Sequence, residues 1–206
     1  MSETDLTLPT PATSSGDRME HGANYAMYYN PDNWDDSLQK GYRPTYYENL
    51  IKSATESVKI WDPWAKNDDK DAGIMESVTC GLEIVILTNL SSDNIEKHKQ
   101  YADCLWEKIP DGFKEDSVLK YCFVDSHKYG QKYFLHDRYL IIDDSRVFLV
   151  GASLSMQVSH FDGLTATTGI YELTEEEDIR IVKEKFRHSY LTAENDGTII
   201  VKPDAE

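Results

Sequence analysis

The chain has 206 residues, of which 40% are hydrophobic and 11% aromatic, and its formal net charge is −16 at pH 7. This length and composition predict one globular domain with short tails and a substantial core. So acidic a chain repels nucleic acid at long range, which makes direct nucleic-acid binding the less favoured function. No apolar run is long enough to cross a bilayer, and the N-terminus lacks the pattern of a secretory signal, so we expect a cytoplasmic protein.

The cysteines and the acidic loop give no sign of a metal site. Cys80, Cys104 and Cys122 are an odd number of thiols at wide spacing, which predicts reduced core cysteines. Residues 65–72 (AKNDDKDA) contain three aspartates but lack the glycine spacing and terminal glutamate of a calcium-binding loop. We therefore predict a solvated charged loop, with no metal and no cofactor.

Composition divides the chain into a domain with two flanking regions. Residues 1–24 are rich in Ser, Thr, Pro and acidic groups, which predicts a disordered tail. Residues 25–44 form an aromatic-rich arm that either packs on the domain or, continued to Tyr47, contacts a protein partner. The domain spans 45–191, and 192–206 is a C-terminal tail in which the TIIV run is either an edge strand or mobile.

Three helices are predicted from caps and apolar periodicity. Capping boxes at Thr45–Glu48 and Thr174–Glu177 indicate the starts of two helices, the second ending near Tyr190. A third helix over 93–109 carries an apolar stripe from Ile95 to Ile109, on which His98 is expected to be half-buried.

Apolar runs between these helices predict six strands, at 58–61, 82–90, 119–124, 133–143, 146–150 and 167–173. The run at 82–90 is apolar enough for a central strand in a covered sheet. A tight turn at Asp144–Ser145 makes the fourth and fifth strands an antiparallel hairpin. Helices that alternate with strands in this way predict an α/β sandwich with a central mixed sheet flanked by helices.

The most informative segment is 133–155, YFLHDRYLIIDDSRVFLVGASLS. In an extended strand His136 and Arg138 point to the same face, so an imidazole would lie beside a fixed positive charge. That pair suits chemistry on a phosphate. Asp143 ends the first apolar run, and a Gly-x-Ser turn at 151–153 follows the second.

These residues resemble the His-x-Lys, Asp, Gly-Ser motif of the phospholipase D superfamily, which is present here once, as His136, Arg138, Asp143, Gly151 and Ser153. Arginine replaces the usual lysine, and Ala152 separates the glycine from the serine. The His-Asp-Arg form, together with the VKIWDPW segment at 58–64, is similar to the phospholipase D-like C-terminal domain of MIT-domain proteins. The resemblance covers residues 42–190 and implies a phospholipase D-like α/β sandwich.

The resemblance also implies roles for the motif residues. His136 would be the nucleophile or acid, Arg138 the phosphate clamp and Ser153 an added donor, while Asp143 would orient an imidazole or balance charge. Such enzymes need two histidines and no metal: one attacks phosphorus, and the other protonates the leaving oxygen and then activates water. The chain supplies one half of this site, so the expected active form is a homodimer with both His136 side chains facing one phosphate.

Positive groups lie near the motif and are candidates for phosphate contacts: His127, Lys128, Lys132, His136, Arg138 and Arg146. Lys128 and Lys132 are equally well explained as ordinary loop lysines. His127 and His160 are weaker candidates for a second catalytic group.

Three functions remain open from the sequence. The first is a phospholipase D-like domain that recognises a phosphodiester or phosphomonoester and hydrolyses it as a homodimer. The second is a non-catalytic module on the same fold that binds a lipid headgroup or a protein, with residues 25–47 as a contact surface. The third is a nuclease of the superfamily, which the charge of −16 disfavours.

Overall fold

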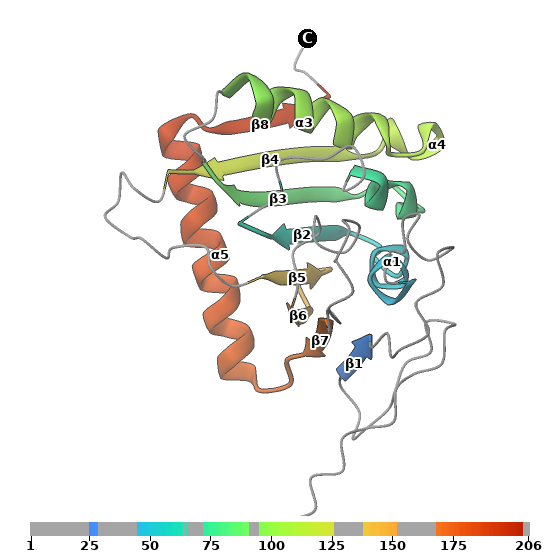
Figure 1. Cartoon of the computed structure of the whole chain (residues 1–206), viewed down its shortest axis with the longest axis vertical. Coiled ribbons are helices and arrows are strands. Elements are labelled where there is room, and N and C mark those ends of the chain that lie inside the picture. Colours follow the sequence, from blue (N-terminus) through green and yellow to red (C-terminus); the bar gives the residue numbers. More distant parts are fainter. Residues whose placement is uncertain are drawn as a thin grey trace, which may run out of the picture.

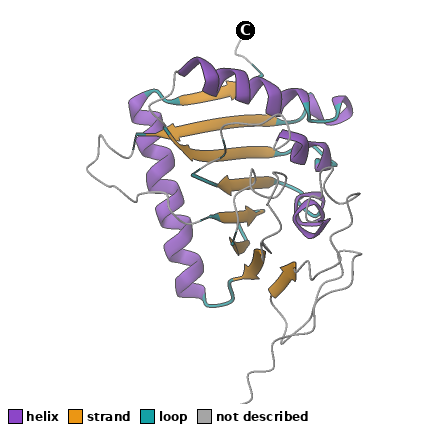
Figure 2. Cartoon of the chain, viewed as in Figure 1, coloured by secondary structure: helices purple, strands orange, loops and turns teal. Residues whose placement is uncertain are grey.

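A mixed sheet lies at the centre of the molecule. The computed structural model describes residues 25–28, 45–63, 65, 72–90, 95–125, 138–151 and 168–203. In this part of the chain eight strands form one sheet, with helix α5 on one face and helices α1 and α3 on the other (Figures 1 and 2). The predicted α/β arrangement, a mixed sheet flanked by helices, is confirmed. The predicted disordered tail, residues 1–24, lies outside the described residues.

The strands lie in the order β1-β7-β6-β5-β2-β3-β4-β8. Their bounds are β1 Tyr25–Tyr28, β2 Ser57–Trp61, β3 Glu83–Asn89, β4 Val118–Val124, β5 Tyr139–Ile142, β6 Arg146–Val150, β7 Thr168–Glu172 and β8 Ile199–Lys202. β2, β3 and β4 are parallel neighbours, and the other pairs are antiparallel. The strand predicted at 133–143 is observed from Tyr139, and its residues before Arg138 lie outside the described part of the chain.

The helices are α1 Thr45–Lys52, α3 Ile95–Glu107, α4 Asp111–Lys114 and α5 Glu176–Asp196, and the 3-10 helix η2 spans Gly73–Ser77. α5 continues past the predicted end near Tyr190 and stops at Gly197, where a φ of 66° allows the amide to cap the last carbonyls. The capping box predicted at Thr174–Glu177 is not formed, because the N-cap residue is Glu175 and it makes no side-chain cap bond. The acidic residues of the first turn stabilise this end of α5 instead, because their negative charges lie near the positive end of the helix dipole.

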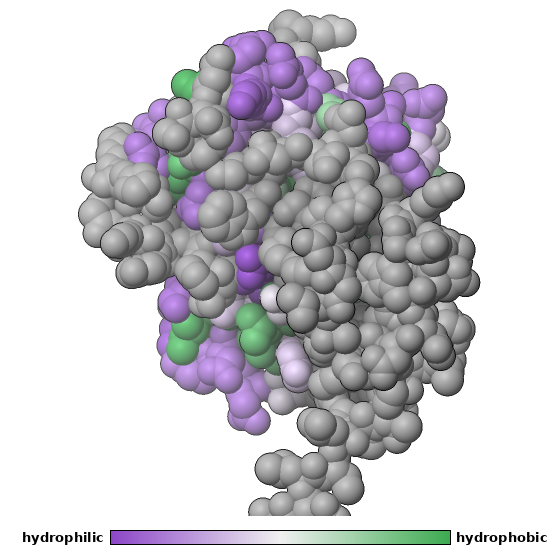
Figure 3. All heavy atoms as spheres, viewed as in Figure 1, coloured by the Kyte–Doolittle hydropathy of each residue, from purple (hydrophilic) through white to green (hydrophobic). Residues whose placement is uncertain are grey.

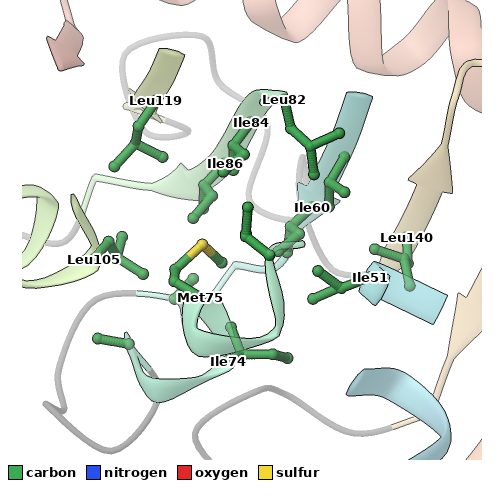
Figure 4. Close-up of a cluster of buried hydrophobic side chains, with 14 of the residues drawn as sticks. Ile51, Ile60, Ile74, Met75, Leu82, Ile84, Ile86, Leu105, Leu119 and Leu140 are labelled. Carbon is green, nitrogen blue, oxygen red and sulfur yellow. The ribbon is translucent and has the colours of Figure 1, made fainter. Parts of the chain in front are cut away.

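Two layers of apolar side chains hold the helices on the sheet. On one face, Ile60 and Ile84 of the sheet pack with Ile51 of α1, Met75 of η2 and Leu105 of α3 (Figure 4). On the other face, the layer contains Trp61, Leu87, Ile141, Val182 and Phe186. Each such side chain contributes about 1.5–3 kcal/mol when it leaves water. In the view of Figure 3 the described surface over α3 and α5 is largely hydrophilic, in agreement with the inward orientation of the apolar stripes.

The β5–β6 hairpin is confirmed, but its turn differs from the prediction. Asp143 and Asp144 both have φ of 51°, and Ser145 N donates to Ile142 O at 3.1 Å. The turn is therefore centred on Asp143–Asp144 rather than Asp144–Ser145. Aspartate is among the few residues other than glycine that adopt this left-handed backbone readily.

Both ends of the sheet come from regions that the sequence analysis placed outside the domain. β8 pairs antiparallel with β4, which confirms the edge-strand alternative for the TIIV run. β1 pairs antiparallel with β7, although residues 25–28 were expected to be an irregular arm. Each of these strands has four residues, which is too few for the alternation of polar and apolar side chains to identify a strand from the sequence.

Three positions refine the expectations for the core. His98 is 2% exposed, and its ring stacks on Phe123 with centroids 4.7 Å apart, so it is buried rather than half-buried. Ile95, the first residue of α3, is 53% exposed and does not join the predicted stripe. Tyr47 is 2% exposed, so its side chain belongs to the core and not to a partner surface.

The three cysteines are free thiols, as expected. Cys122 is buried between the sheet and α5, and burial raises the pKa of its thiol to about 12. Cys80 and Cys104 are half-buried against the other apolar layer. None of the three forms a disulfide in the structure.

Gly81 lies where the segments before β3 and β4 approach each other closely, and a substitution there tests this contact. A Cβ atom at this position would overlap Asp116 Cβ and lie 2.7 Å from Asp116 O, so Gly81→Ala should lower the free energy of unfolding by about 1–3 kcal/mol. Gly112→Ala is the matched control, because nothing lies within 4 Å of its Cβ position and alanine favours the helix. Urea unfolding of both variants measures the difference, and equal midpoints would contradict the predicted close contact.

Candidate functional site

Several segments begin or end at one edge of the sheet. The parallel strands β2, β3 and β4 end there, as does β6, and β5 begins there because it is antiparallel to both β2 and β6. In open α/β sheets, ligands bind outside the carboxyl ends of the parallel strands. We call this the carboxyl edge and define it by Trp61–Asp62, Thr88–Asn89, Val124, Arg138 and Val150–Gly151.

The two halves of the sequence motif meet at the carboxyl edge. Arg138 directly precedes β5, Gly151 directly follows β6, and Val150 N donates to Arg138 O at 2.9 Å. The chain segments that carry His136 and Ser153 therefore join the sheet at neighbouring strand ends. His136 and Ser153 themselves lie outside the described residues.

Arg138 has a buried carboxylate as its neighbour. Trp61 pairs with Tyr139, so Asp62 and Arg138 lie opposite each other one position further along, on the face that carries α1. Arg138 Nε is 3.7 Å from Asp62 Oδ1, and the two side chains are 19% and 3% exposed. This distance suits an ion pair but is too long for a hydrogen bond.

Several buried polar atoms at the carboxyl edge have no hydrogen-bond partner. Among the described residues they include the buried atoms Arg138 Nε, Trp61 Nε1, Thr88 Oγ1 and Asn89 Oδ1. Because Trp61 also pairs with Leu87, Thr88 adjoins Asp62, and Arg138, Asp62 and Thr88 form a row across three strands. Trp61 lies on the face under α5, whereas Arg138 and Thr88 lie on the face that carries α1. Roughly 90% of buried polar groups in proteins are hydrogen-bonded, so the two exceptions in the row, Arg138 Nε and Thr88 Oγ1, favour a site for a ligand or ordered water.

Two buried tyrosines lie near Asp62. Burial raises the pKa of both Tyr47 and Tyr121, and the negative charge of Asp62 adds to the shift. Tyr121 donates its hydroxyl to Ala65 O at 2.7 Å and lies 3.1 Å from His98 Nδ1. Both phenols therefore stay neutral at physiological pH, and a buried polar cluster lies behind the row.

Asp143 lies at the opposite end of β5. At about 3.3 Å per residue, it is about 16 Å from Arg138 along the strand. Its carboxylate accepts hydrogen bonds from the amides of Thr55, Glu56 and Ser57 at 2.8 to 3.1 Å, and from the Thr55 hydroxyl at 3.0 Å. The predicted role of orienting an imidazole does not fit this geometry, because these oxygens hold the start of β2.

The electrostatics of Asp143 agree with a structural role. Partial burial raises the pKa of its carboxyl, but the hydrogen bonds from the Ser57, Glu56 and Thr55 amides outweigh burial, so the pKa lies below its usual range. Asp143 is thus ionised at physiological pH and stabilised by backbone dipoles.

Arg146 does not belong to the positive group predicted around the motif. It lies at the far end of β6, where its guanidinium donates to both carboxylate oxygens of Glu172 at 2.7 and 3.1 Å and lies 4.9 Å from the Phe148 ring centroid. The remaining members apart from Arg138 lie outside the described residues: His127, Lys128, Lys132 and His136. His160 lies outside them as well.

Asp62 was not expected from the sequence to be a site residue. A signal existed in the VKIWDPW segment, whose Asp-Pro-aromatic ending was already part of the family resemblance. Thr88 gave no such signal, because one threonine in an apolar run looks like an ordinary strand residue.

In the described part of the chain, no three His, Cys, Asp or Glu side chains are grouped as a metal site would require. No helix there has the length and apolar character needed to cross a membrane.

No family model and no curated protein matches this sequence. Similar solved structures include NucT from Helicobacter pylori, with 20% identity and a TM-score of 0.47 over 82% of this chain and 96% of that one. Nuc from Salmonella typhimurium, a phospholipase D family member, has 13% identity and a TM-score of 0.45 over 82% and 94%. TrmBL2, an archaeal chromatin protein with a novel mode of DNA binding, has 15% identity and a TM-score of 0.37 over 72% and 48%. Likeness at this level assigns no residue role.

Asp143→Asn tests the structural role of this carboxylate. The variant removes the charge but keeps the left-handed turn accessible, and we expect it to lower the free energy of unfolding at pH 7 by about 1–2 kcal/mol. Because the folded pKa is lowered, the wild-type contribution is present above the unfolded pKa of about 4 and disappears as the pH falls through the folded value. Urea unfolding from pH 7 down to about pH 3 should therefore show a steeper loss in the wild type.

Asp144→Asn is the control for this experiment. Asp144 has the same φ of 51°, but its carboxylate is 51% exposed and pairs with Lys59 at 2.6 Å. An exposed pair of this kind contributes less than about 1 kcal/mol. Equal stability and equal pH dependence of the two variants would show that the backbone hydrogen bonds of Asp143 are not important.

Proposed function

We propose that this chain is a phospholipase D-like domain that recognises a phosphodiester and hydrolyses it at the carboxyl edge of the sheet. The observation that supports this function is the contact between Val150 N and Arg138 O at 2.9 Å. This contact makes neighbours of two strand ends that are separated in sequence, one leading to His136 and the other to Ser153. Covalent geometry keeps the Cα atom of His136 within about 7 Å of that of Arg138.

The proposed chemistry assigns a role to each motif residue. His136 attacks phosphorus and carries the phosphoryl group, while Arg138 stabilises negative charge on the phosphorus oxygens. Ser153 adds a hydroxyl donor. Asp143 supports the site indirectly, because it holds the β5–β6 hairpin on the start of β2.

A second histidine completes the reaction in this scheme. It protonates the leaving oxygen and afterwards activates the water that releases the phosphoryl group. We propose that the second copy of the chain supplies it, since a twofold axis brings the same patch of each subunit to one place. The active species is then a homodimer with two His136 side chains and two Arg138 side chains around one phosphate.

The Asp62–Arg138 pair favours a second candidate function, a phosphate-binding module without turnover. The carboxylate offsets part of the charge that Arg138 would place on a transition state, and the guanidinium is bulkier than the lysine usual in the motif. Phosphate binding tolerates both features more readily than catalysis does. In this alternative the ligand is a lipid headgroup or a phosphorylated partner, and the residues of 25–44 beyond β1 supply further contacts.

Hydrolysis of bis(4-nitrophenyl) phosphate separates the two functions. We expect metal-independent turnover by the wild type, no detectable turnover by His136→Ala, and a loss of about 100-fold in kcat/KM for Arg138→Ala. Arg180→Ala is the control, because Arg180 is exposed on α5 and pairs only with Glu177 and Glu184 among the contacts seen. Light scattering of the same samples should show a dimer.

Each contrary result has a distinct meaning. Turnover that persists in His136→Ala would exclude this histidine as the nucleophile, and a fully active monomer would exclude the shared site. A wild type that binds dimethyl phosphate but hydrolyses nothing would support the binding module instead.

A further inference from the structure

The carboxylate beside Arg138 comes from a rigid part of the backbone. Asp62 N donates to Leu87 O at 3.0 Å, and Asp62 O accepts from Ala65 N at 3.2 Å. These bonds fix the residue on both sides at the end of β2. The Arg138 backbone is held in turn by the bond from Val150 N. Asp62 and Arg138 therefore face each other from backbone positions that hydrogen bonds hold in place. Arg138 Nε lies 3.7 Å from Asp62 Oδ1.

The guanidinium group needs such a support if it is to bind phosphate in one orientation. Arginine has a long side chain with several rotatable bonds, and its planar fork binds an anion well only when the plane is set. Asp62 approaches the Nε side of the fork, which leaves the terminal Nη groups for another anion. Arg138 Nε has no hydrogen bond among the described residues, and a shift of about 0.8 Å would allow one with Asp62.

We propose that Asp62 is a positioning residue of the phosphate site, which holds the Arg138 guanidinium by its Nε side and directs the Nη groups to the phosphate. This inference rests on the proposed function, because it requires that Arg138 binds a phosphate. Asp62 thereby takes the place that the sequence analysis gave to Asp143, as the carboxylate that orients a charged group of the site. Thr88 adjoins Asp62 in the row, on the side away from Arg138.

Simple electrostatics predicts the opposite effect, so the two accounts can be separated. A carboxylate near an anion site repels the anion, and its removal should strengthen phosphate binding. If the carboxylate positions Arg138, in contrast, its removal should weaken phosphate binding, because the guanidinium is then free to turn toward water. The sign of the change in affinity therefore decides between them.

The experiment uses the full chain, the Nε–H signals of its arginines in nitrogen-15 NMR, and dimethyl phosphate as the probe. Arg138→Lys identifies the Arg138 signal by its loss. Without ligand, we expect Arg138 Nε–H in the wild type to exchange with water more slowly than that of the exposed Arg187 and to lose this protection in Asp62→Asn. With dimethyl phosphate, Asp62→Asn should raise the Kd about tenfold, which corresponds to one charge-assisted hydrogen bond.

Two variants accompany Asp62→Asn. Asp62→Glu keeps the carboxylate and should recover part of the affinity, which loss of folding alone would not allow. Glu172→Gln breaks the Arg146–Glu172 pair at the far end of the sheet and should leave the Kd unchanged. Thermal unfolding of every variant shows whether it is folded at the temperature of the titration.

The outcomes separate this inference from the proposed function. A wild type that binds no dimethyl phosphate overturns both. A wild type that binds, together with an Asp62→Asn variant that binds equally or more tightly, overturns the positioning role alone. Fast exchange of Arg138 Nε–H in the wild type also overturns it, and that result does not depend on the folding of any Asp62 variant.

Discussion

The pairing of β5 with β2 is the interaction on which both the core and the candidate site depend. Its antiparallel register places Leu140 beside Ile60 in the apolar layer and brings Arg138 opposite Asp62 at the carboxyl edge. At the other end, the Asp143 carboxylate holds the amides of residues 55–57. Because side chains alternate between the faces of a sheet, a slip of one residue would move Leu140 and Ile142 to the other apolar layer and separate Arg138 from Asp62.

Asp143 and Asp62 lie at opposite ends of the β2–β5 pair, and their carboxylates have different partners because their surroundings differ. Asp143 is at a turn, where its oxygens accept from backbone amides and no cation is needed. Asp62 is 3% exposed and lies beside a guanidinium, because a buried charge without a partner is costly.

In the proposed function, one chain supplies half of the arrangement that phosphodiester hydrolysis by histidines needs. One copy contributes a single motif, with its arginine partly balanced by a carboxylate. A second copy would double the positive charge and the number of imidazoles at the phosphate. In the positioning role proposed for Asp62, the pairing that limits the charge also orients Arg138, and a guanidinium held in one plane is compatible with tight anion binding.

The sequence alone was enough to predict the α/β class, the central position of β3 and the β5–β6 hairpin, and it locates the segment proposed to carry the site. These follow from local patterns: continuous apolar runs, short links and the spacing from His136 to Ser153. The contact of Arg138 with Asp62 rather than Asp143, and the completion of the sheet by β1 and β8, are visible only in the folded molecule. Asp62 and Arg138 are distant in sequence, and their proximity results from strand order and register. Periodicity along one strand shows which face a residue occupies, but not which strand lies beside it.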